Sequence, residues 1–244
     1  MTKIYNAEII DCALKIKDSL VICDLHLGYE TALNQNGILI PQFQYKKIIN
    51  KLYKIREKTC ANKIIINGDL KHSFQKIQKQ ENKEILGLLD YLDKYYDEII
   101  IIKGNHDNLT QYITQERNII LKDYYIEDNY YITHGHQIPE SIPENIKTII
   151  IGHEHPSITL RNHERIEKIK IYLTGLWNNK NLIVQPTFKF LSYGQDMLQK
   201  RTLSPFLDDI NYLDFNVYGV DDFNTFYFGT LNELLEFQQE NKEI

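Results

Sequence analysis

The chain has 244 residues, of which 43% are hydrophobic and 25% are charged, and its formal net charge at pH 7 is −5. This composition is ordinary for a globular protein, and it contains no apolar run near the roughly 18–20 residues that a membrane-spanning helix needs. The N-terminal residues lack the long apolar segment of a secretory signal. Three cysteines without a Cys-x-x-Cys spacing indicate neither a disulfide framework nor a zinc knuckle. We therefore expect a cytoplasmic protein without membrane contact.

The excess of acidic residues, 33 Asp and Glu against 28 Lys and Arg, excludes a surface that is basic overall. Proteins that bind nucleic acid mainly by charge usually carry a basic face. Any polyanion must therefore be held by a local feature, such as a metal ion or a small lysine patch.

Short β-branched runs recur along the first two thirds of the chain, and each leads into a polar cluster. The runs lie at 19–23, 63–67, 98–103, 130–133 and 148–151. Continuous apolar runs of this length predict strands that are buried on both faces. Two helical stripes fall between them, one following Pro41 through Ile55 and one over 85–92. This alternation predicts a largely parallel sheet, with the polar clusters gathered along one edge of it.

Beyond about residue 160 the pattern changes. Residues 166–171 alternate apolar and polar with period two, and further strands are predicted at 182–184, 214–218 and 225–228. A capping box from Thr230 to Glu233 opens a last helix. We predict a single α/β domain over residues 1–244, with a motif core at about 19–160. A second, more mixed sheet at about 161–244 packs on the first, and a separate C-terminal domain is the alternative.

The histidines point to the chemistry. All except His163 lie in or just after the polar clusters, at His26, His72, His106, His134, His136, His153 and His155. Residues i and i+2 of an extended segment point the same way, so such pairs can present two ligands to one point. Carboxylate, imidazole and amide ligands suit Mn, Fe, Co, Ni or Zn, and the lack of thiolates argues against a closed structural zinc site. Ligands around one shared carboxylate suggest two metals roughly 3.5–4 Å apart, a pair that generates a hydroxide and clamps a phosphoryl group for in-line attack.

The clusters resemble, in this order, the five motifs of the calcineurin-like metallophosphoesterase superfamily: Asp24-x-His26, Gly68-Asp69, Gly104-Asn105-His106-Asp107, His134-Gly135-His136 and Gly152-His153-x-His155. The resemblance implies two packed mixed sheets flanked by helices and two divalent metal ions, manganese first, with Fe, Zn, Ni or Co as alternatives. It implies one metal bound by Asp24, His26 and His155, a second by Asn105, His134 and His153, and Asp69 as the bridge between them. His106 would act on the leaving oxygen, as general acid or as a charge stabiliser.

Three further residues lie in or beside these motifs. His72 stands where many superfamily nucleases have an aspartate that orients the catalytic histidine. A neutral imidazole there brings no charge, so the role of His106 as an acid depends on what holds its ring. We expect Asp107 to brace its own turn. His136 either touches substrate or supports the ligands from outside, and we favour support.

Gly68 to His72 and the later segment 182–196 look most like the small ICC-like group, which includes the DNA-ligase-associated metallophosphoesterases. Lys189 departs from that pattern, because a small polar residue is expected there. The resemblance implies a phosphodiesterase, with a DNA endonuclease acting on single strands as the leading hypothesis and a repair helicase or ligase as candidate partner. Lys71 and Lys103 flank the predicted site and would contact a substrate phosphate, with a solvated lysine as the alternative. Hydrolysis of a nucleotide, cyclic nucleotide or phosphomonoester, and a non-catalytic scaffold, are the competing hypotheses.

Overall fold

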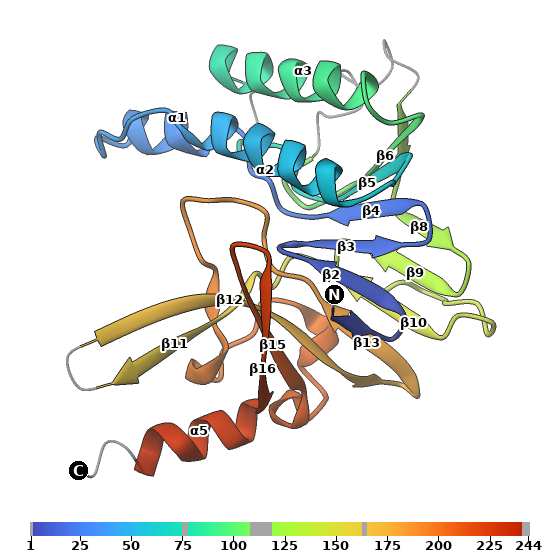
Figure 1. Cartoon of the computed structure of the whole chain (residues 1–244), viewed down its shortest axis with the longest axis vertical. Coiled ribbons are helices and arrows are strands. Elements are labelled where there is room, and N and C mark those ends of the chain that lie inside the picture. The colour runs from blue at the N-terminus through green and yellow to red at the C-terminus, as the bar shows by residue number, and fades with distance from the viewer. Residues whose placement is uncertain (1, 75–77, 108–118, 163–164, 241–244) are drawn as a thin grey trace.

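The computed structural model describes residues 2–74, 78–107, 119–162 and 165–240, which form two packed mixed β-sheets with helices on the outer faces (Figure 1). The predicted α/β class is therefore confirmed. The first sheet runs in the order β1 (Lys3–Ile4), β2 (Ala7–Ile10), β3 (Ala13–Ile16), β4 (Ser19–Ile22), β5 (Lys63–Asn67), β6 (Glu98–Ile102) and β7 (Ile120–Lys122). Its strands are antiparallel from β1 to β4 and parallel from β4 to β7.

The second sheet contains β8 (Tyr124–Glu127), β9 (Tyr130–Thr133), β10 (Thr148–Ile151), β11 (Pro156–Asn162), β12 (Arg165–Trp177), β13 (Lys180–Val184), β14 (Gln195–Asp196), β15 (Asn216–Asp221) and β16 (Asn224–Thr230). Strands β9, β10 and β13 are parallel, whereas the pairs β11–β12, β12–β13 and β15–β16 are antiparallel. The expectation of a largely parallel sheet holds for the strands that lead into the polar clusters and for their neighbours β7 and β13, whereas the other strands are mostly antiparallel.

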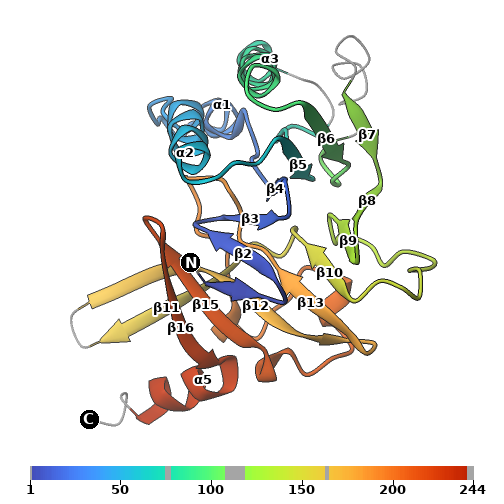
Figure 2. The same ribbon diagram turned by 45° about the vertical axis from the view of Figure 1, so that its right-hand side comes forward.

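Helices α1 (Tyr29–Gln35), α2 (Gln44–Lys58) and α3 (Lys79–Asp93) cover the outer side of the first sheet, and α5 (Leu231–Glu240) lies at the far side of the second (Figures 1 and 2). Helix α2 begins at Gln44 and not near Pro41. The carboxylate of Glu30 accepts hydrogen bonds from the N–H groups of Phe43 at 2.7 Å and Gln44 at 2.9 Å, which satisfies donors that the first helical turn leaves free. Among the described residues, no helix is long and apolar enough to cross a bilayer.

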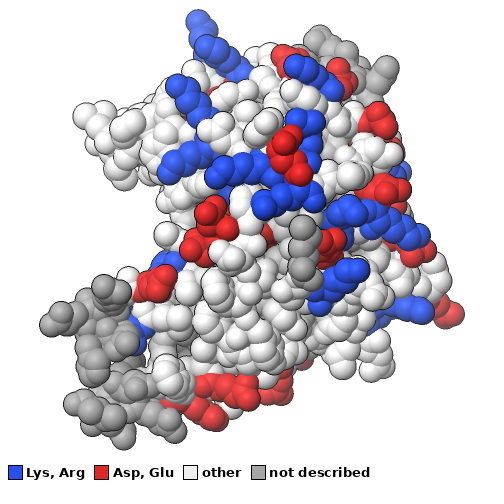
Figure 3. All heavy atoms as spheres, in the orientation of Figure 1, with Lys and Arg blue, Asp and Glu red and all other residues white. Residues whose placement is uncertain are grey.

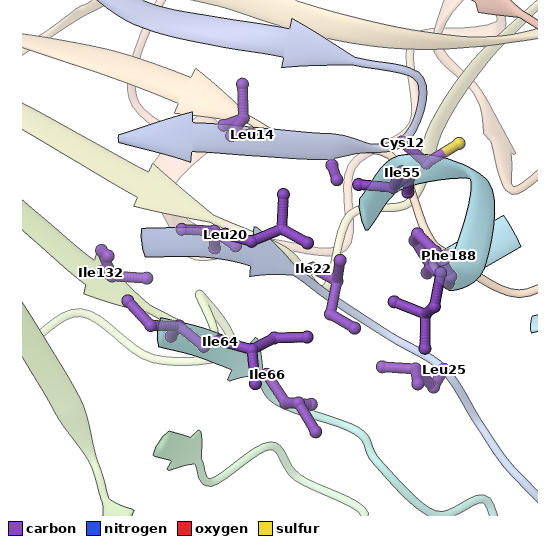
Figure 4. Packing of buried hydrophobic residues seen from close by; sticks show 14 of the residues in the cluster. Cys12, Leu14, Leu20, Ile22, Leu25, Ile55, Ile64, Ile66, Ile132 and Phe188 are labelled. Atoms are coloured by element: carbon purple, nitrogen blue, oxygen red, sulfur yellow. The ribbon is translucent and has the colours of Figure 1, made fainter. Parts of the chain in front are cut away.

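The core explains why the two sheets stay together. On β9, Ile132 packs into the same buried cluster as the first sheet, whereas its neighbour Tyr131 packs into a second cluster on the other face. This alternation follows from the period of two in a strand. Ile132 belongs to the same buried cluster as Leu20 of β4 and Ile64 of β5, which are the labelled residues nearest to it in Figure 4. The apolar contact between the sheets thus involves the same strands that carry the polar clusters.

The polar clusters come from two sheets and not from one. Three follow β4, β5 and β6 of the first sheet, and two follow β9 and β10 of the second. The prediction of a single sheet edge was therefore wrong. Because the two sheets pack face to face, the carboxyl ends of these parallel strands still meet at one end of the sandwich.

Candidate metal centre and active site

Two groups of candidate ligand atoms lie side by side, each within 4.8 Å: Asp24, His26 and His155 form one, and Asp69, His134 and His153 form the other. His155 Nε2 lies 3.1 Å from Asp24 Oδ1. Asp69 Oδ2 lies 3.5 Å from His26 Nε2 and 3.6 Å from His134 Nε2, so it stands between the two groups. Asn105 Oδ1 joins the second group at 3.2 Å from His134 Nε2. The seven predicted ligands therefore converge, and their assignment to metals stays a prediction.

The backbone at this centre is not extended, contrary to the expectation for the paired ligands. Asp24 and His26 have φ values of 55° and 45°, Asp69 has 49°, and His153 and His155 have 61° and 49°. A left-handed conformation costs roughly 1–2 kcal/mol for each residue with a Cβ. Such strain persists where the surrounding structure imposes it, and it clusters at functional sites. The N–H of His26 is held by the carbonyl of Asp69 at 2.9 Å, which ties the first cluster to the second.

Glycines give the ligands room to approach one another. A Cβ on Gly68 would lie 2.1 Å from the Nδ1 of His134, and a Cβ on Gly104 would lie 2.1 Å from the Oδ1 of Asp69. Each glycine therefore makes space for a ligand that belongs to a different motif. This explains why glycine directly precedes Asp69 and Asn105 in the sequence.

The charges at the centre favour cations. Burial alone would raise the pKa of Asp69, but His134 and His26 hold the pKa of this carboxyl at about 2. Burial opposes the charge of His134 as well, yet Asp69 and Asp24 raise the pKa of its imidazole to about 9. Burial and the neighbouring His134 lower the pKa of His153 to about 4. Carboxylates and neutral imidazoles are the donors that divalent transition metals prefer. His153 is already neutral at pH 7, and His134 would release its proton when an ion binds, so the residues present fit such ions.

His106 is held by a backbone carbonyl. The ring Nδ1 of His106 donates to the carbonyl oxygen of His72, and the backbone N–H of His106 donates to Asp69 Oδ1 at 3.0 Å. With the proton on Nδ1, the Nε2 atom faces the centre, 3.8 Å from Asp69 Oδ2. The His72 ring does not take the place of an orienting aspartate, because it stacks beside His106 with 5.4 Å between ring centroids. Ring nitrogens of His26, His72 and His106 also lie within 4.8 Å of one another.

Two other predicted residues lie at the edges of the centre. The Asp107 carboxylate accepts from the N–H of Gly104 at 2.9 Å and from that of Leu70 at 3.4 Å, which joins its own turn to the loop after Asp69. The His136 ring lies 5.2 Å from that of His134 and 6.1 Å from that of His153. His163 lies outside the described residues.

The two lysines differ from each other. Lys71 is fully buried and donates to the carbonyl of Ser73, contrary to both expectations. The side chain of Lys103 is partly exposed and pairs with Asp123 at 3.1 Å, which agrees with the alternative of a solvated lysine. Lys189, which the sequence marks only as a departure, lies at the centre with its Nζ 4.2 Å from the ring of Tyr29. Burial lowers the pKa of Lys189 to about 8, although Asp24 and Asp69 act in the opposite direction.

Sequence reasoning missed the residues that hold the loops in place. The Glu81 carboxylate accepts from the N–H of His72 at 2.9 Å and of Ser73 at 2.8 Å, and thereby fixes the carbonyl that holds His106. The Thr187 hydroxyl donates to the carbonyl of Asp24 at 2.7 Å. These contacts span 9 and 163 positions respectively. Only the position of Glu81 in the first turn of α3 offered a sequence signal.

Comparison with known proteins identifies the class. The family model for calcineurin-like phosphoesterases matches residues 19–219. The chain belongs to this family of metal-dependent phosphoesterases, which are hydrolases. No curated protein matches the chain.

Solved structures of other proteins resemble this chain. The crystal structure of the nuclease MPE of Pseudomonas putida matches with a TM-score of 0.60 and 15% identity, over 90% of this chain and 93% of that one. The phosphoesterase Yfce of E. coli matches with a TM-score of 0.41 and 13% identity, over 90% of this chain and 94% of that one. The likeness to MPE supports the assignment of the fold.

Proposed function

We propose that this chain hydrolyses phosphodiester bonds with two divalent metal ions, and that manganese is the first ion to test. The observation that carries the proposal is the meeting of two ligand groups at one carboxylate, Asp69. Ions bound there would activate a water molecule and neutralise charge on the phosphoryl group.

The chain's own residues supply position and a proton. Asp69 holds the N–H of His106 and so fixes the imidazole relative to both ligand groups. The carbonyl of His72 keeps a proton on Nδ1 of that ring, which leaves Nε2 to face the substrate. When His106 is protonated, Nε2 donates to the leaving oxygen as the bond to phosphorus breaks.

The proposed substrate is single-stranded DNA. Helix α2 carries exposed Lys46, Lys47, Lys54 and Lys58 on a chain whose net charge is negative, and Figure 3 shows basic side chains gathered over this helix. A local basic face of this kind attracts a phosphate backbone. A structure of similar fold is a nuclease by name, which makes a diester the first substrate to test.

The test of the DNA hypothesis separates binding of the DNA strand from hydrolysis of the phosphodiester bond. The double variant Lys46→Gln, Lys54→Gln removes two exposed charges of α2, and Lys147→Gln serves as control because its exposed side chain precedes β10, at the end opposite the centre. We expect weaker binding of an oligothymidylate. The slope of the logarithm of the binding constant against the logarithm of the salt concentration should become less steep by about 0.7 for each phosphate that the variant no longer neutralises. Hydrolysis of bis-p-nitrophenyl phosphate stays unchanged. Equal DNA affinity in all three proteins would contradict the hypothesis.

The second candidate is a small phosphoester: a nucleotide, a cyclic nucleotide or a phosphomonoester. The same ligand groups serve it. Manganese-loaded protein is therefore assayed with bis-p-nitrophenyl phosphate, p-nitrophenyl phosphate and labelled single-stranded DNA. Activity on the monoester alone would reject the nuclease hypothesis. A repair helicase or ligase partner would be sought only if DNA is cleaved.

The metal centre itself is tested by Asp69→Asn. Loss of this carboxylate weakens both ligand groups at once, so we expect the purified variant to lose metal and activity together. Metal content is measured by elemental analysis. A wild-type protein that binds no divalent metal would favour the non-catalytic scaffold.

A further inference from the structure

Lys189 is a largely buried residue beside the candidate metal centre. It is 7% exposed, and its Nζ lies over the ring of Tyr29. In the described part of the chain, Nζ makes no hydrogen bond and no ion pair with an oxygen atom. A charge that is largely removed from water and has no hydrogen-bonding partner is costly. The arrangement therefore favours an anion that the protein itself does not provide.

Other lysines of the interior are satisfied differently. Lys71 donates to a backbone carbonyl, and Lys51 pairs with Asp11 at 2.7 Å. Lys170 donates to the carbonyls of Thr187 and Lys189. Each of these ammonium groups has an oxygen partner, whereas Lys189 has an aromatic face. The cation–π contact with Tyr29 holds the side chain in place and leaves its N–H donors available.

The backbone that carries Lys189 is fixed relative to the centre. Its N–H donates to the hydroxyl of Thr187 at 3.1 Å, and that hydroxyl donates to the carbonyl of Asp24. Lys170 binds the carbonyl on the other side. The Tyr29 ring lies 4.7 Å from that of His72, which in turn stacks beside His106. Lys189 therefore lies on the same side of the centre as His106.

We propose that the Nζ of Lys189 binds a phosphate oxygen of the substrate. This inference rests on the proposed phosphodiesterase function and adds to it a substrate contact outside the metal ligands. The next residue, Phe190, lies under Lys51 with 4.8 Å between Nζ and the ring centroid and under Lys47 at 5.7 Å. The Lys189 segment thus joins the centre to the basic face of α2.

The test compares Lys189→Met with wild type, with Lys147→Met as the charge-matched control. Methionine keeps the length of the side chain and removes the charge. All proteins are loaded with manganese and checked for metal content. We expect kcat/KM for bis-p-nitrophenyl phosphate to fall, and the inhibition constant of inorganic phosphate to rise, each by about 10- to 100-fold, as for loss of a hydrogen bond to a charged group. The control changes neither value.

The phosphate that Lys189 binds is either the reacting phosphate or a neighbouring phosphate of the strand, and the choice of substrate distinguishes the two. If Lys189 binds the reacting phosphate, both bis-p-nitrophenyl phosphate and an oligothymidylate are affected. If it binds a neighbouring phosphate of a strand, only the oligothymidylate is affected. Values within about twofold of wild type for every substrate and for phosphate would overturn the proposal.

Stability provides a readout that does not depend on turnover. Without phosphate, Lys189→Met and Lys189→Gln should melt no lower than wild type, because both variants remove a buried charge that has no oxygen partner. Phosphate should raise the melting temperature of the wild type more than that of either variant. Loss of folding or of metal in both variants would overturn the proposal, because the proposal gives Lys189 a role in binding phosphate and none in folding or in metal binding. Wild-type protein that binds phosphate through Lys189 but cleaves no ester would instead contradict the proposed function alone.

Discussion

At the scale of single residues, His106 differs from the family pattern in its support. A backbone carbonyl and not a carboxylate accepts the hydrogen bond from Nδ1, and Glu81 fixes that carbonyl through the N–H of Ser73, which belongs to the same peptide group. A carbonyl orients the ring as well as an aspartate does, but it adds no negative charge to stabilise an imidazolium. The orientation of His106 is therefore independent of the side chain at position 72.

Removing the imidazole tests the role of His106. We expect His106→Gln to keep its metals and to lower turnover by about 10²–10⁴-fold, the range for a lost acid–base group. The measurements are steady-state turnover and metal content on the same sample. If the variant loses a metal, His106 is a ligand, as its closeness to His26 and His72 would then explain.

Removing the neighbouring ring should have far less effect. His72→Ala keeps the carbonyl that holds His106, so we expect turnover to fall by less than about tenfold, below the range for a lost acid–base group. Turnover as a function of pH is measured for both proteins. A loss as large as that of His106→Gln would show that the His72 ring itself takes part.

At the scale of elements, the turn between β2 and β3 is tied to α2. Asp11 lies in that turn and pairs with Lys51 of the helix. Burial by itself would raise the pKa of Asp11, but the charge of Lys51 and hydrogen bonds from Lys51 and the N–H of Cys12 outweigh it and lower this pKa. The pair therefore stabilises the fold only while Asp11 is ionised.

The stabilisation of the fold by the Asp11–Lys51 ion pair should depend on pH. Because the pKa of Asp11 is lower in the folded chain, its stabilisation is present above about pH 4 and is lost as the pH falls through the folded value. We expect Asp11→Asn to reduce the free energy of unfolding by about 1–3 kcal/mol at neutral pH. Urea titrations of metal-free wild type and variant from neutral to acidic pH measure the difference. A difference that does not shrink in acid would contradict this account.

At the scale of the whole molecule, the candidate metal centre lies between the two sheets. Asp24, His26 and Asp69 follow strands of the first sheet, whereas His134, His153 and His155 follow strands of the second. Ions held between these groups would join the sheets through bonds that the unfolded chain lacks.

Metal removal should therefore lower the melting temperature. A ligand at 100 times its dissociation constant adds about 2.7 kcal/mol to stability. We expect chelation to abolish activity and lower the melting temperature, and added manganese to restore both. Asp69→Asn should show no such response. Equal melting temperatures with and without metal would contradict the bridge between the sheets.

We also propose that residues 1–244 form a single domain. Ile132, Ile150 and Ile183 of the second sheet belong to the same buried cluster as the strands of the first. Calorimetry of the metal-free protein should show one unfolding transition. Two separate transitions would favour an independent C-terminal domain.

Much of the architecture was predictable from the chain itself. Apolar runs such as 98–103 predicted buried strands, because a strand covered on both faces has apolar side chains on both faces. The capping box of Thr230 and Glu233 likewise predicted the start of α5. Helix α1 was not predicted, because its seven residues carry no apolar stripe, and strands β1 to β3 are too short for a clear period.

The sequence alone determined the family, the α/β class and the candidate ligand residues, because these depend on local pattern and on the order of the motifs. Only the tertiary structure decided which groups meet: that Gly104 leaves room for Asp69, that a carbonyl of His72 and not its ring holds His106, and that Lys189 has no oxygen partner among the described residues. These contacts join residues from different motifs and both sheets. Their geometry is fixed by how the two sheets pack, which no local pattern in the chain encodes.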